Sequence, residues 1–216
     1  MARRRVFEVD EAIDIATDLF WRQGYDRTSV SDLTEAMGIT PPSFYHAFGS
    51  KEALFEAVLK RYLTGPLGFI DKALAQPTAL AVAEHFLRGY ADTFIDPAHP
   101  GCLSVNSALP IGGEKDYVRN LLFDARRAMR KRLQTRLEAA KASGDLPTDA
   151  NVDDLARFIQ VVYYGLSIEA QSGASRKDLH RSVDLALRAW PHIAPKRSRP
   201  VLKGTRDRRR GPKSTG

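Results

Sequence analysis

Residues 28–54 read TSVSDLTEAMGITPPSFYHAFGSKEAL, and the spacing of apolar residues in this stretch predicts two short helices. The helices are expected over residues 29–37 and from residue 40 to about residue 47, with a tight turn at Gly38 between them. Two short helices joined in this way form a helix-turn-helix, in which the first helix lies across a DNA backbone and the second enters the major groove.

Capping residues support both helix starts. Ser29 and Asp32 have the spacing of a capping pair, and Pro41 fits a first helical turn because its missing N–H is not needed there. The side chains with the spacing to pack the two helices together are Val30, Leu33, Ala36, Met37, Ile39 and Phe44. The outer face of the second helix is left to Thr40, Pro41, Pro42, Ser43, Tyr45 and His46.

The rest of the chain also predicts helices, and no run of strict two-residue alternation indicates a strand. We expect an all-α protein of about nine helices, over residues 8–23, 29–37, 40–47, 50–63, 79–95, 103–109, 114–143, 152–172 and 176–190. The predicted organisation is a helix-turn-helix domain over residues 1–50 with a linking helix over 51–64, a larger helical domain over 65–194 and a basic, disordered tail over 195–216.

Several motifs around the helix-turn-helix resemble one known family. They are Leu19-Phe20 before Gly24, TSV at 28–30, FYHAF at 44–48 and GSKEAL at 49–54. In this order and spacing they resemble the DNA-binding domain of the TetR family of bacterial transcription regulators, whose third helix commonly reads LYHYF before a small residue and SKE. A loop reading PGCLSVNSAL at 100–109 is similar to a segment of one large subgroup.

The resemblance implies a homodimer that places one recognition helix per subunit in successive major grooves of a palindromic operator in double-stranded DNA. It further implies that Lys51 holds a phosphate, which agrees with its place at a helix start. The residues expected to contact DNA are Arg27, Thr28, Ser29, Ser31, Thr40, Pro41, Pro42, Ser43, Tyr45, His46 and Lys51.

The recognition helix departs from the family pattern, which often has Lys or another polar residue where Pro41 stands and Gly or Ala at Pro42. No Arg, Lys, Asn or Gln lies between Thr40 and Phe48, so the strongest bidentate readers of bases are absent. We therefore expect readout through Ser43, Tyr45, apolar contact with thymine methyl groups and DNA shape.

The net charge of +7 is unevenly distributed along the chain. Residues 195–216 hold nine Lys and Arg against one Asp, whereas residues 1–61 hold eight Lys and Arg against ten Asp and Glu. The positive groups of the DNA-binding region must therefore gather on one face. We expect Arg3, Arg4 and Arg5 to act either as a minor-groove arm or as a solvated terminus, and the tail to add nonspecific affinity.

Two C-terminal helices carry apolar stripes, which in the resembling family form a four-helix bundle with the symmetry mate. The alternative is that both stripes face the core of the same subunit. The residues predicted at the dimer interface are Leu155, Ile159, Val162, Tyr163, Leu166, Leu179, Val183, Ala186, Leu187 and Trp190.

An effector pocket for a small, partly apolar molecule is expected among the helices of the larger domain. Plain core packing is the alternative for each of its residues, which are Phe86, Tyr90, Phe94, Cys102, Leu103, Asn106, Tyr117, Phe123, Arg126 and Phe158. Cys102 is the single cysteine, which excludes a disulfide framework and a Cys-rich zinc site. Its place before a short helix suits either a reactive thiolate sensor or a small buried residue.

Other classes of protein are disfavoured. The sequence shows no phosphate-binding glycine loop, nucleophile elbow or HExxH, and we expect no enzyme, cofactor or metal. No signal peptide or membrane span is evident, so a bacterial cytoplasmic, nucleoid-associated protein is expected. The leading interpretation is a ligand-released repressor, with the signal passing through the helix that begins at Ser50. The alternatives are a ligand-binding or interaction protein with a vestigial helix-turn-helix, or nonspecific nucleic-acid binding through the basic tail.

Overall fold

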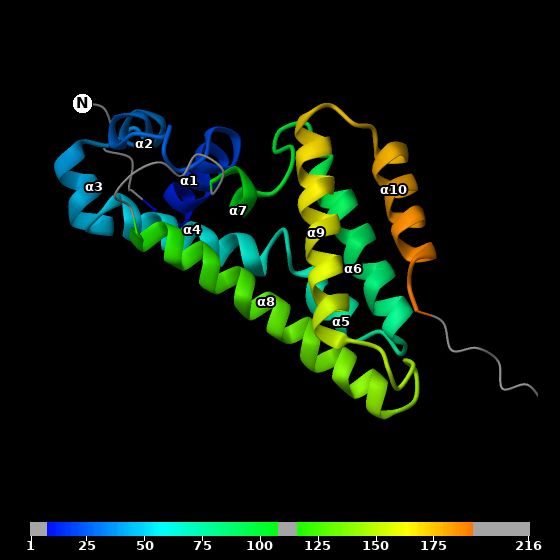
Figure 1. The fold of residues 1–216 in the computed structure, drawn as a ribbon. Helices are drawn as coiled ribbons and strands as arrows, with labels where there is room; N and C mark the ends of the chain where they lie inside the picture. The colour runs from blue at the N-terminus through cyan, green and yellow to red at the C-terminus, as the bar shows by residue number, and fades with distance from the viewer. Residues whose placement is uncertain (1–7, 108–115, 192–216) are drawn as a thin grey trace, which may run out of the picture.

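The computed structural model describes residues 8–107 and 116–191, and this part of the chain consists of helices and connecting loops (Figure 1). The predicted arginine arm at Arg3 to Arg5 and the basic tail over 195–216 lie outside it. The helices are α1 (Val9–Gln23), α2 (Val30–Met37), α3 (Pro41–Phe48), α4 (Lys51–Thr64), α5 (Phe69–Leu74), α6 (Ala79–Phe94), α7 (Leu103–Asn106), α8 (Asp116–Ala142), α9 (Val152–Gln171) and α10 (Arg176–Arg188).

The nine predicted helices are all present, which confirms the all-α class, but the sequence analysis missed α5. Gly65 and Pro66 indicated a stop, and the six residues of α5 begin at Phe69, after an N-cap residue, Gly68, that offers no side-chain cap. Tertiary packing holds this helix instead: Ile70 and Ala73 are buried, and Phe69 makes an edge-to-face contact of 5.3 Å between ring centroids with Tyr90 of α6.

Capping chemistry fixes the starts of the longer helices. The N–H of Asp32 donates to Ser29 Oγ (3.1 Å) while the N–H of Ser29 donates to Asp32 Oδ2 (2.7 Å), a reciprocal capping box that begins α2. The Ser175–Asp178 pair repeats this arrangement at α10, and Asn151 caps α9. These bonds join residues two or three positions apart, so the helix starts follow from local sequence.

The arrangement of the helices separates two regions (Figure 1). Helices α1, α2 and α3 lie together at one end, and α4 leads away from them toward the larger set formed by α5 to α10. Helix α8 runs along both regions, contacting α4 near its start and α9 further along. Helix α9 packs against α6, α8 and α10.

A continuous apolar core joins the two regions. In the first, Phe20, Tyr25 and Phe55 pack with ring centroids 5.0–5.7 Å apart, and all three side chains are buried. In the second, Tyr90 stacks on Tyr163 at 4.4 Å. Aromatic pairs of this geometry add to the stabilisation that comes from burying their area.

Within the described ranges, no helix is long and apolar enough to cross a membrane. The same ranges contain no group of three or more His, Cys, Asp or Glu side chains placed to hold a metal ion.

The capping box of α2 predicts the effect of Ser29→Ala. We expect a loss of about 1 kcal/mol of unfolding free energy at pH 7, because an orphan amide of α2 loses its acceptor. Hydrogen bonds from Ser29 lower the pKa of Asp32. The Asp32 carboxylate therefore contributes to the free energy of unfolding above its unfolded pKa, near 4. This contribution is lost as the pH falls through the lower pKa of the folded state.

Urea unfolding of both proteins at pH 7 and at lower pH measures this effect. The control is Ser31→Ala, a neighbouring exposed serine that caps nothing. Equal midpoints for the Ser29 and Ser31 variants at pH 7 would contradict the expected role of the box.

Candidate DNA-binding surface and its connection to the C-terminal helices

Helix α3 is anchored by one side and presents the other to solvent. Phe44 is fully buried, with its ring 5.5 Å from that of Phe48. Thr40 caps the helix by accepting from the N–H of Ser43 (3.4 Å), and the two hydroxyls lie 2.9 Å apart. As predicted, the opposite face is exposed and consists of Thr40, Pro41, Pro42, Ser43, Tyr45 and His46. Tyr45 is 50% exposed, which is unusual for a large aromatic side chain without a partner surface.

The start of α2 is only partly as predicted. Ser29, Ser31 and Arg27 are exposed beside it. Thr28, however, is completely buried, and its hydroxyl donates to the carbonyl of Gly24 (2.8 Å). The prediction that Thr28 contacts phosphate is therefore wrong, because this side chain closes the end of α1 inside the protein.

Lys51 at the start of α4 is also held by the protein. Its Nζ donates to the carbonyl of Tyr25 (2.7 Å) and lies 4.0 Å from the centroid of the Tyr25 ring. The Tyr25 hydroxyl donates to Glu52 (2.8 Å), and burial together with this carboxylate raises the pKa of Tyr25. Lys51 thus fixes α4 against the segment that follows α1. A phosphate bound by Lys51 would meet an ammonium group that already donates one hydrogen bond to the Tyr25 carbonyl.

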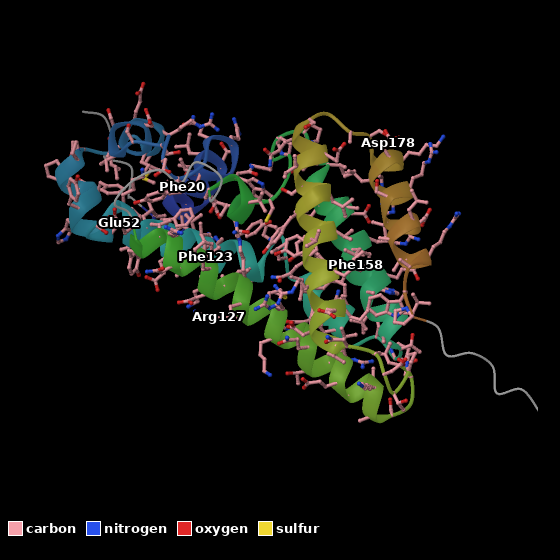
Figure 2. All side chains as sticks on the ribbon, viewed as in Figure 1. Phe20, Glu52, Phe123, Arg127, Phe158 and Asp178 are labelled. Carbon is pink, nitrogen blue, oxygen red and sulfur yellow. The ribbon has the colours of Figure 1, made fainter. Side chains whose placement is uncertain are left out.

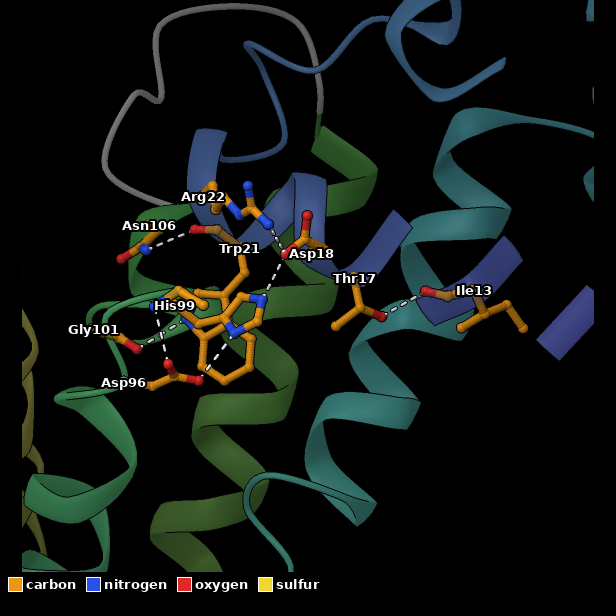
Figure 3. A network of polar contacts seen from close by, with 10 residues as sticks. Ile13, Thr17, Asp18, Trp21, Arg22, Asp96, His99, Gly101 and Asn106 are labelled. Atoms are coloured by element: carbon orange, nitrogen blue, oxygen red, sulfur yellow. Dashed lines mark hydrogen bonds and ion pairs between the residues drawn. The ribbon is translucent and has the colours of Figure 1, made fainter. Parts of the chain in front are cut away.

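The end of α1 contacts the loop and short helix that follow α6 (Figure 3). Trp21 Nε1 donates to the carbonyl of Gly101 (2.9 Å), and Asn106 Nδ2 donates to the carbonyl of Trp21 (2.9 Å). The imidazole of His99 lies between two carboxylates, 2.8 Å from Asp18 and 3.1 Å from Asp96, and packs on the Trp21 ring at 4.8 Å. We call these five residues with Gly101 the junction cluster.

The junction cluster continues to α9. Gln171 of α9 donates to Asn106 Oδ1, and Ser167 Oγ accepts from the N–H of Cys102 (2.8 Å). Two hydrogen bonds in series, through Asn106, therefore connect Gln171 of α9 with Trp21 at the end of α1. The sequence analysis named only α4 for this connection, because pairing between α1 and a distant loop leaves no periodic signal.

Cys102 lies at the N-cap of α7, where the sequence placed it. It is buried, and its Sγ accepts from the Tyr62 hydroxyl (3.2 Å) and lies 3.1 Å from Ser104 Oγ. Burial raises the pKa of Tyr62 well above its usual value. These contacts favour the packing interpretation of Cys102, and a sensing role for its thiol stays a prediction.

The residues predicted for an effector pocket do not gather in one described cavity. Phe86, Tyr90, Phe94, Cys102 and Leu103 are buried in the core, and Phe158 is half-buried on α9. Asn106 belongs to the junction cluster, and the exposed Tyr117 donates to Glu56 of α4 (2.7 Å). Only Phe123 and Arg126 line a described cleft, which lies between α8 and α9 and has a volume of about 390 Å³.

The predicted dimer stripes require a correction. Ile159, Tyr163, Leu166, Leu179, Val183 and Trp190 are buried inside a single subunit, and Leu155, Val162, Ala186 and Leu187 are half-buried against the same core. The buried members of the α9 stripe face α6, α8 and α10, and those of α10 face α6 and α9, so the core of the same subunit covers them. The exposed apolar side chains of α9 and α10 are Val161 (62% exposed), Ile168 (46%) and Leu185 (63%).

The α2–turn–α3 unit with its exposed second helix, joined to a larger helical region, defines a helix-turn-helix regulator that binds DNA. Comparison with known proteins gives the same class. Residues 12–58 match the family model for bacterial regulatory proteins of the tetR family, and residues 79–186 match that for the tetracyclin repressor-like C-terminal domain.

Two of three individual relatives span both regions, and the third matches a shorter stretch. The HTH-type transcriptional repressor ComR of Escherichia coli is 36% identical over 88% of this chain and 92% of its own length. A cysteine-substituted variant of the TetR family regulator CifR, solved with a 26-base-pair double-stranded operator, superposes with a TM-score of 0.82 at 38% identity, over 88% of this chain and 100% of that one. The repressor BdcR of Escherichia coli is 48% identical over 28% of this chain and 31% of its own.

The chain belongs to the TetR family. It is a DNA-binding transcriptional repressor, and the regulators of this family are typically dimers that bind double-stranded DNA and a ligand.

The close approach at the junction predicts unequal costs for two glycine substitutions. Gly24 (φ 77°, ψ 165°) and Gly38 (φ 66°, ψ 34°) both need positive φ, but a Cβ on Gly24 would lie 2.9 Å from the carbonyl oxygen of Asn106. A Cβ on Gly38 meets no atom within 4 Å. We expect Gly38→Ala to cost about 1 kcal/mol of unfolding free energy and Gly24→Ala at least about 2–3 kcal/mol.

Urea unfolding monitored by far-UV circular dichroism measures both costs: Gly38→Ala reports the strain of the left-handed region, whereas Gly24→Ala adds a backbone region that is essentially restricted to glycine and the close approach of Asn106. Similar losses in the two variants would show that α1 and α7 do not approach each other as closely as described.

Proposed function

We propose that this repressor binds a palindromic operator through the exposed face of α3, one copy from each subunit, and is released when a small molecule binds among the C-terminal helices. The observation that carries the proposal is the solvent-facing row of Thr40, Ser43, Tyr45 and His46 on a helix anchored by the buried Phe44. The proposed action is binding without a catalytic step, and it places the protein at the nucleoid in the bacterial cytoplasm.

The chemistry of α3 suits a particular kind of readout. Pro41 and Pro42 present apolar surface at the amino end of the helix, which fits the methyl groups of thymine. The hydroxyl of Ser43 is placed to bond a base edge, and the Tyr45 hydroxyl to bond a phosphate. The free amides at the starts of α2 and α3 also favour phosphate. Specificity then depends strongly on groove shape, because no described α3 side chain is a bidentate base reader.

The domain boundaries of the proposal follow the contacts. We propose that α1 to α3 form the DNA-binding unit, that α4 links it to the rest, and that α5 to α10 bind ligand and partner. The family models match on either side of residues 59–78, which supports a division in this region.

We propose that the outer face of α9 and α10 forms the dimer interface. Val161, Gly165 and Ile168 lie on one side of α9, three to four residues apart, and no atom lies within 4 Å of a Cβ built on Gly165. This gap allows a partner helix to approach closely, which accounts for a glycine inside a helix despite its cost of about 1 kcal/mol. Leu185 extends the exposed apolar surface onto α10.

Release by a ligand requires two shapes with different spacing of the α3 helices. A ligand shifts their populations only through its different affinity for each. We propose that α4 and the junction cluster transmit the change, since the Trp21–Gly101 and Asn106–Gln171 contacts join α1 to α9.

Tyr45→Phe tests the recognition surface. We expect operator affinity to fall about tenfold, because a hydrogen bond to a charged phosphate contributes about 1.5–3 kcal/mol. The operator is first obtained by selecting genomic fragments with the purified protein, and affinity is then measured by fluorescence anisotropy at fixed salt.

Tyr117→Phe removes a hydroxyl of similar exposure (53%) that lies on α8 and donates to Glu56 of α4, so it controls for the loss of an exposed phenol hydroxyl outside α3. Deletion of residues 195–216 should leave specific binding in place. Unchanged affinity of the Tyr45 variant, or loss of all binding on deletion of the tail, would contradict recognition through α3.

Leu185→Glu tests the proposed dimer face. We expect dissociation of the dimer at micromolar concentration and a matching loss of operator affinity, since the substitution places a charge in an apolar interface. Sedimentation equilibrium measures the association, and Leu80→Glu, at an exposed leucine of α6, is the control. A dimer that survives Leu185→Glu with normal affinity would place the interface elsewhere.

A further inference from the structure

The described cleft between α8 and α9 is unusually rich in positive charge. Its lining consists of Phe123, Arg126, Arg127, Arg130, Arg157, Gln160, Val161 and Tyr164, which include four arginines and no carboxylate. Figure 2 shows Phe123 and Arg127 along the middle of α8, with the side of α9 nearby. The volume of about 390 Å³ is within the range of small-molecule sites.

Two of the four arginines are already paired, and two are not. Arg127 pairs with Asp124 and Arg157 with Asp153 (3.1 Å), each on its own helix. Arg126 and Arg130, both half-buried, form no ion pair with any residue of the described ranges. Half-buried guanidinium groups without a counter-ion are costly, and a bound anion would remove that cost.

Arg126 is held in place and remains incompletely satisfied. Its Nη2 donates to the carbonyl of Ser104 (2.7 Å), and its guanidinium lies 5.3 Å from the Tyr164 ring centroid. Its Nε is buried and has no hydrogen-bond partner within the described part of the chain. Gln160 supports this arrangement by donating to the carbonyl of Arg126 (3.2 Å). The guanidinium is therefore oriented before any ligand arrives.

The remaining lining is apolar. Phe123, which is 41% exposed, borders the arginines together with the ring of Tyr164, and Val161 lies at the edge of the cleft, where it meets the proposed dimer interface. A molecule that fills the cleft would cover these side chains while its anionic group meets Arg126 and Arg130. Planar guanidinium groups match the oxygens of carboxylates and phosphates, so either head group satisfies the site.

We propose that this cleft is the effector site and that the effector is a small amphipathic anion, a carboxylate or phosphate monoester attached to an apolar body. The proposal rests on the ligand-release function above and adds the location and the chemical class. It also connects the site to the DNA-binding unit, because Arg126 bonds to Ser104 in α7, whose Asn106 bonds to Trp21 of α1.

Direct binding to the full-length, DNA-free dimer tests the proposal. The probes are octanoate, phenylacetate and phenyl phosphate, with the neutral octanamide and phenylacetamide as matched compounds. Calorimetry and thermal unfolding should show binding of at least one anion and at least tenfold weaker binding of its neutral partner. The carboxylate and phosphate arms identify which head group is preferred.

Variants locate the binding. Arg130→Gln removes a charge without breaking a described contact and should weaken anion binding at least tenfold, as should Arg126→Met, which keeps the packing of its stem. Lys131→Gln is the control, because it makes the same charge change one residue along α8 but lines a different hollow. The same anions should release the protein from its operator, and Arg130→Gln should raise the anion concentration needed for that release.

Each result has a distinct meaning. No binding by any anion, equal binding by the neutral compounds, or equal loss in the Arg130 and Lys131 variants overturns the anion site. Dimer dissociation in Arg130→Gln overturns it too, because the cleft would then be filled by the partner subunit. Failure of the ligand-free wild type to bind any operator instead overturns the proposed function, whatever the calorimetry shows.

Discussion

The hydrogen bond from Trp21 to the carbonyl of Gly101 fixes the position of the first region of the molecule relative to the second. The indole N–H, the only donor of this side chain, donates to that carbonyl. The rings of His99 and Tyr62 both pack on the indole, each with 4.8 Å between ring centroids. A buried indole N–H without this acceptor would carry a desolvation cost of about 1–3 kcal/mol. The position of α1, and with it that of α2 and α3, therefore depends on the loop between α6 and α7.

Charged side chains gather at the junction cluster and not on the exposed face of α3, although a DNA-binding helix commonly carries basic residues. The junction places Asp18 and Asp96 around His99, away from α3, so acidic groups serve the connection between regions. The exposed face of α3 carries hydroxyls, a phenol ring, an imidazole and prolines, with no Asp, Glu, Lys or Arg. Affinity for phosphate is left to helix amides and a few cations, which makes binding sensitive to the shape of the groove.

The sequence predicted the helix-turn-helix closely because its signals are local. Ser29, Gly38, Thr40 and Pro41 act within a few residues, and their roles follow from backbone chemistry that any fold has to respect. The buried Phe44 and the exposed Tyr45 then follow from helical spacing alone.

The parts that could not be predicted depend on contacts between distant segments. An apolar stripe such as that of Tyr163 and Val183 shows that a helix side is buried, but not whether the covering surface belongs to the same subunit. Thr28 precedes a helix start, which is a usual place for a phosphate ligand, but its contact with the end of α1 buries it. Helix α5 lacks a local capping signal and is held by its packing on α6. Hydroxyl groups and short helices take their roles from tertiary surroundings.

The length of α8 has a mechanical consequence. Its 27 residues correspond to a rod of about 40 Å. Near its start Tyr117 is tied to Glu56 of α4, and in its middle Arg126 is tied to Ser104. Arg126 lies about 15 Å from the start of this rod, so a tilt of about 5° at the proposed effector site would move that start by about 1 Å. Because the start of α8 is bonded to α4, such a tilt would pass directly to the helix that leads to α3.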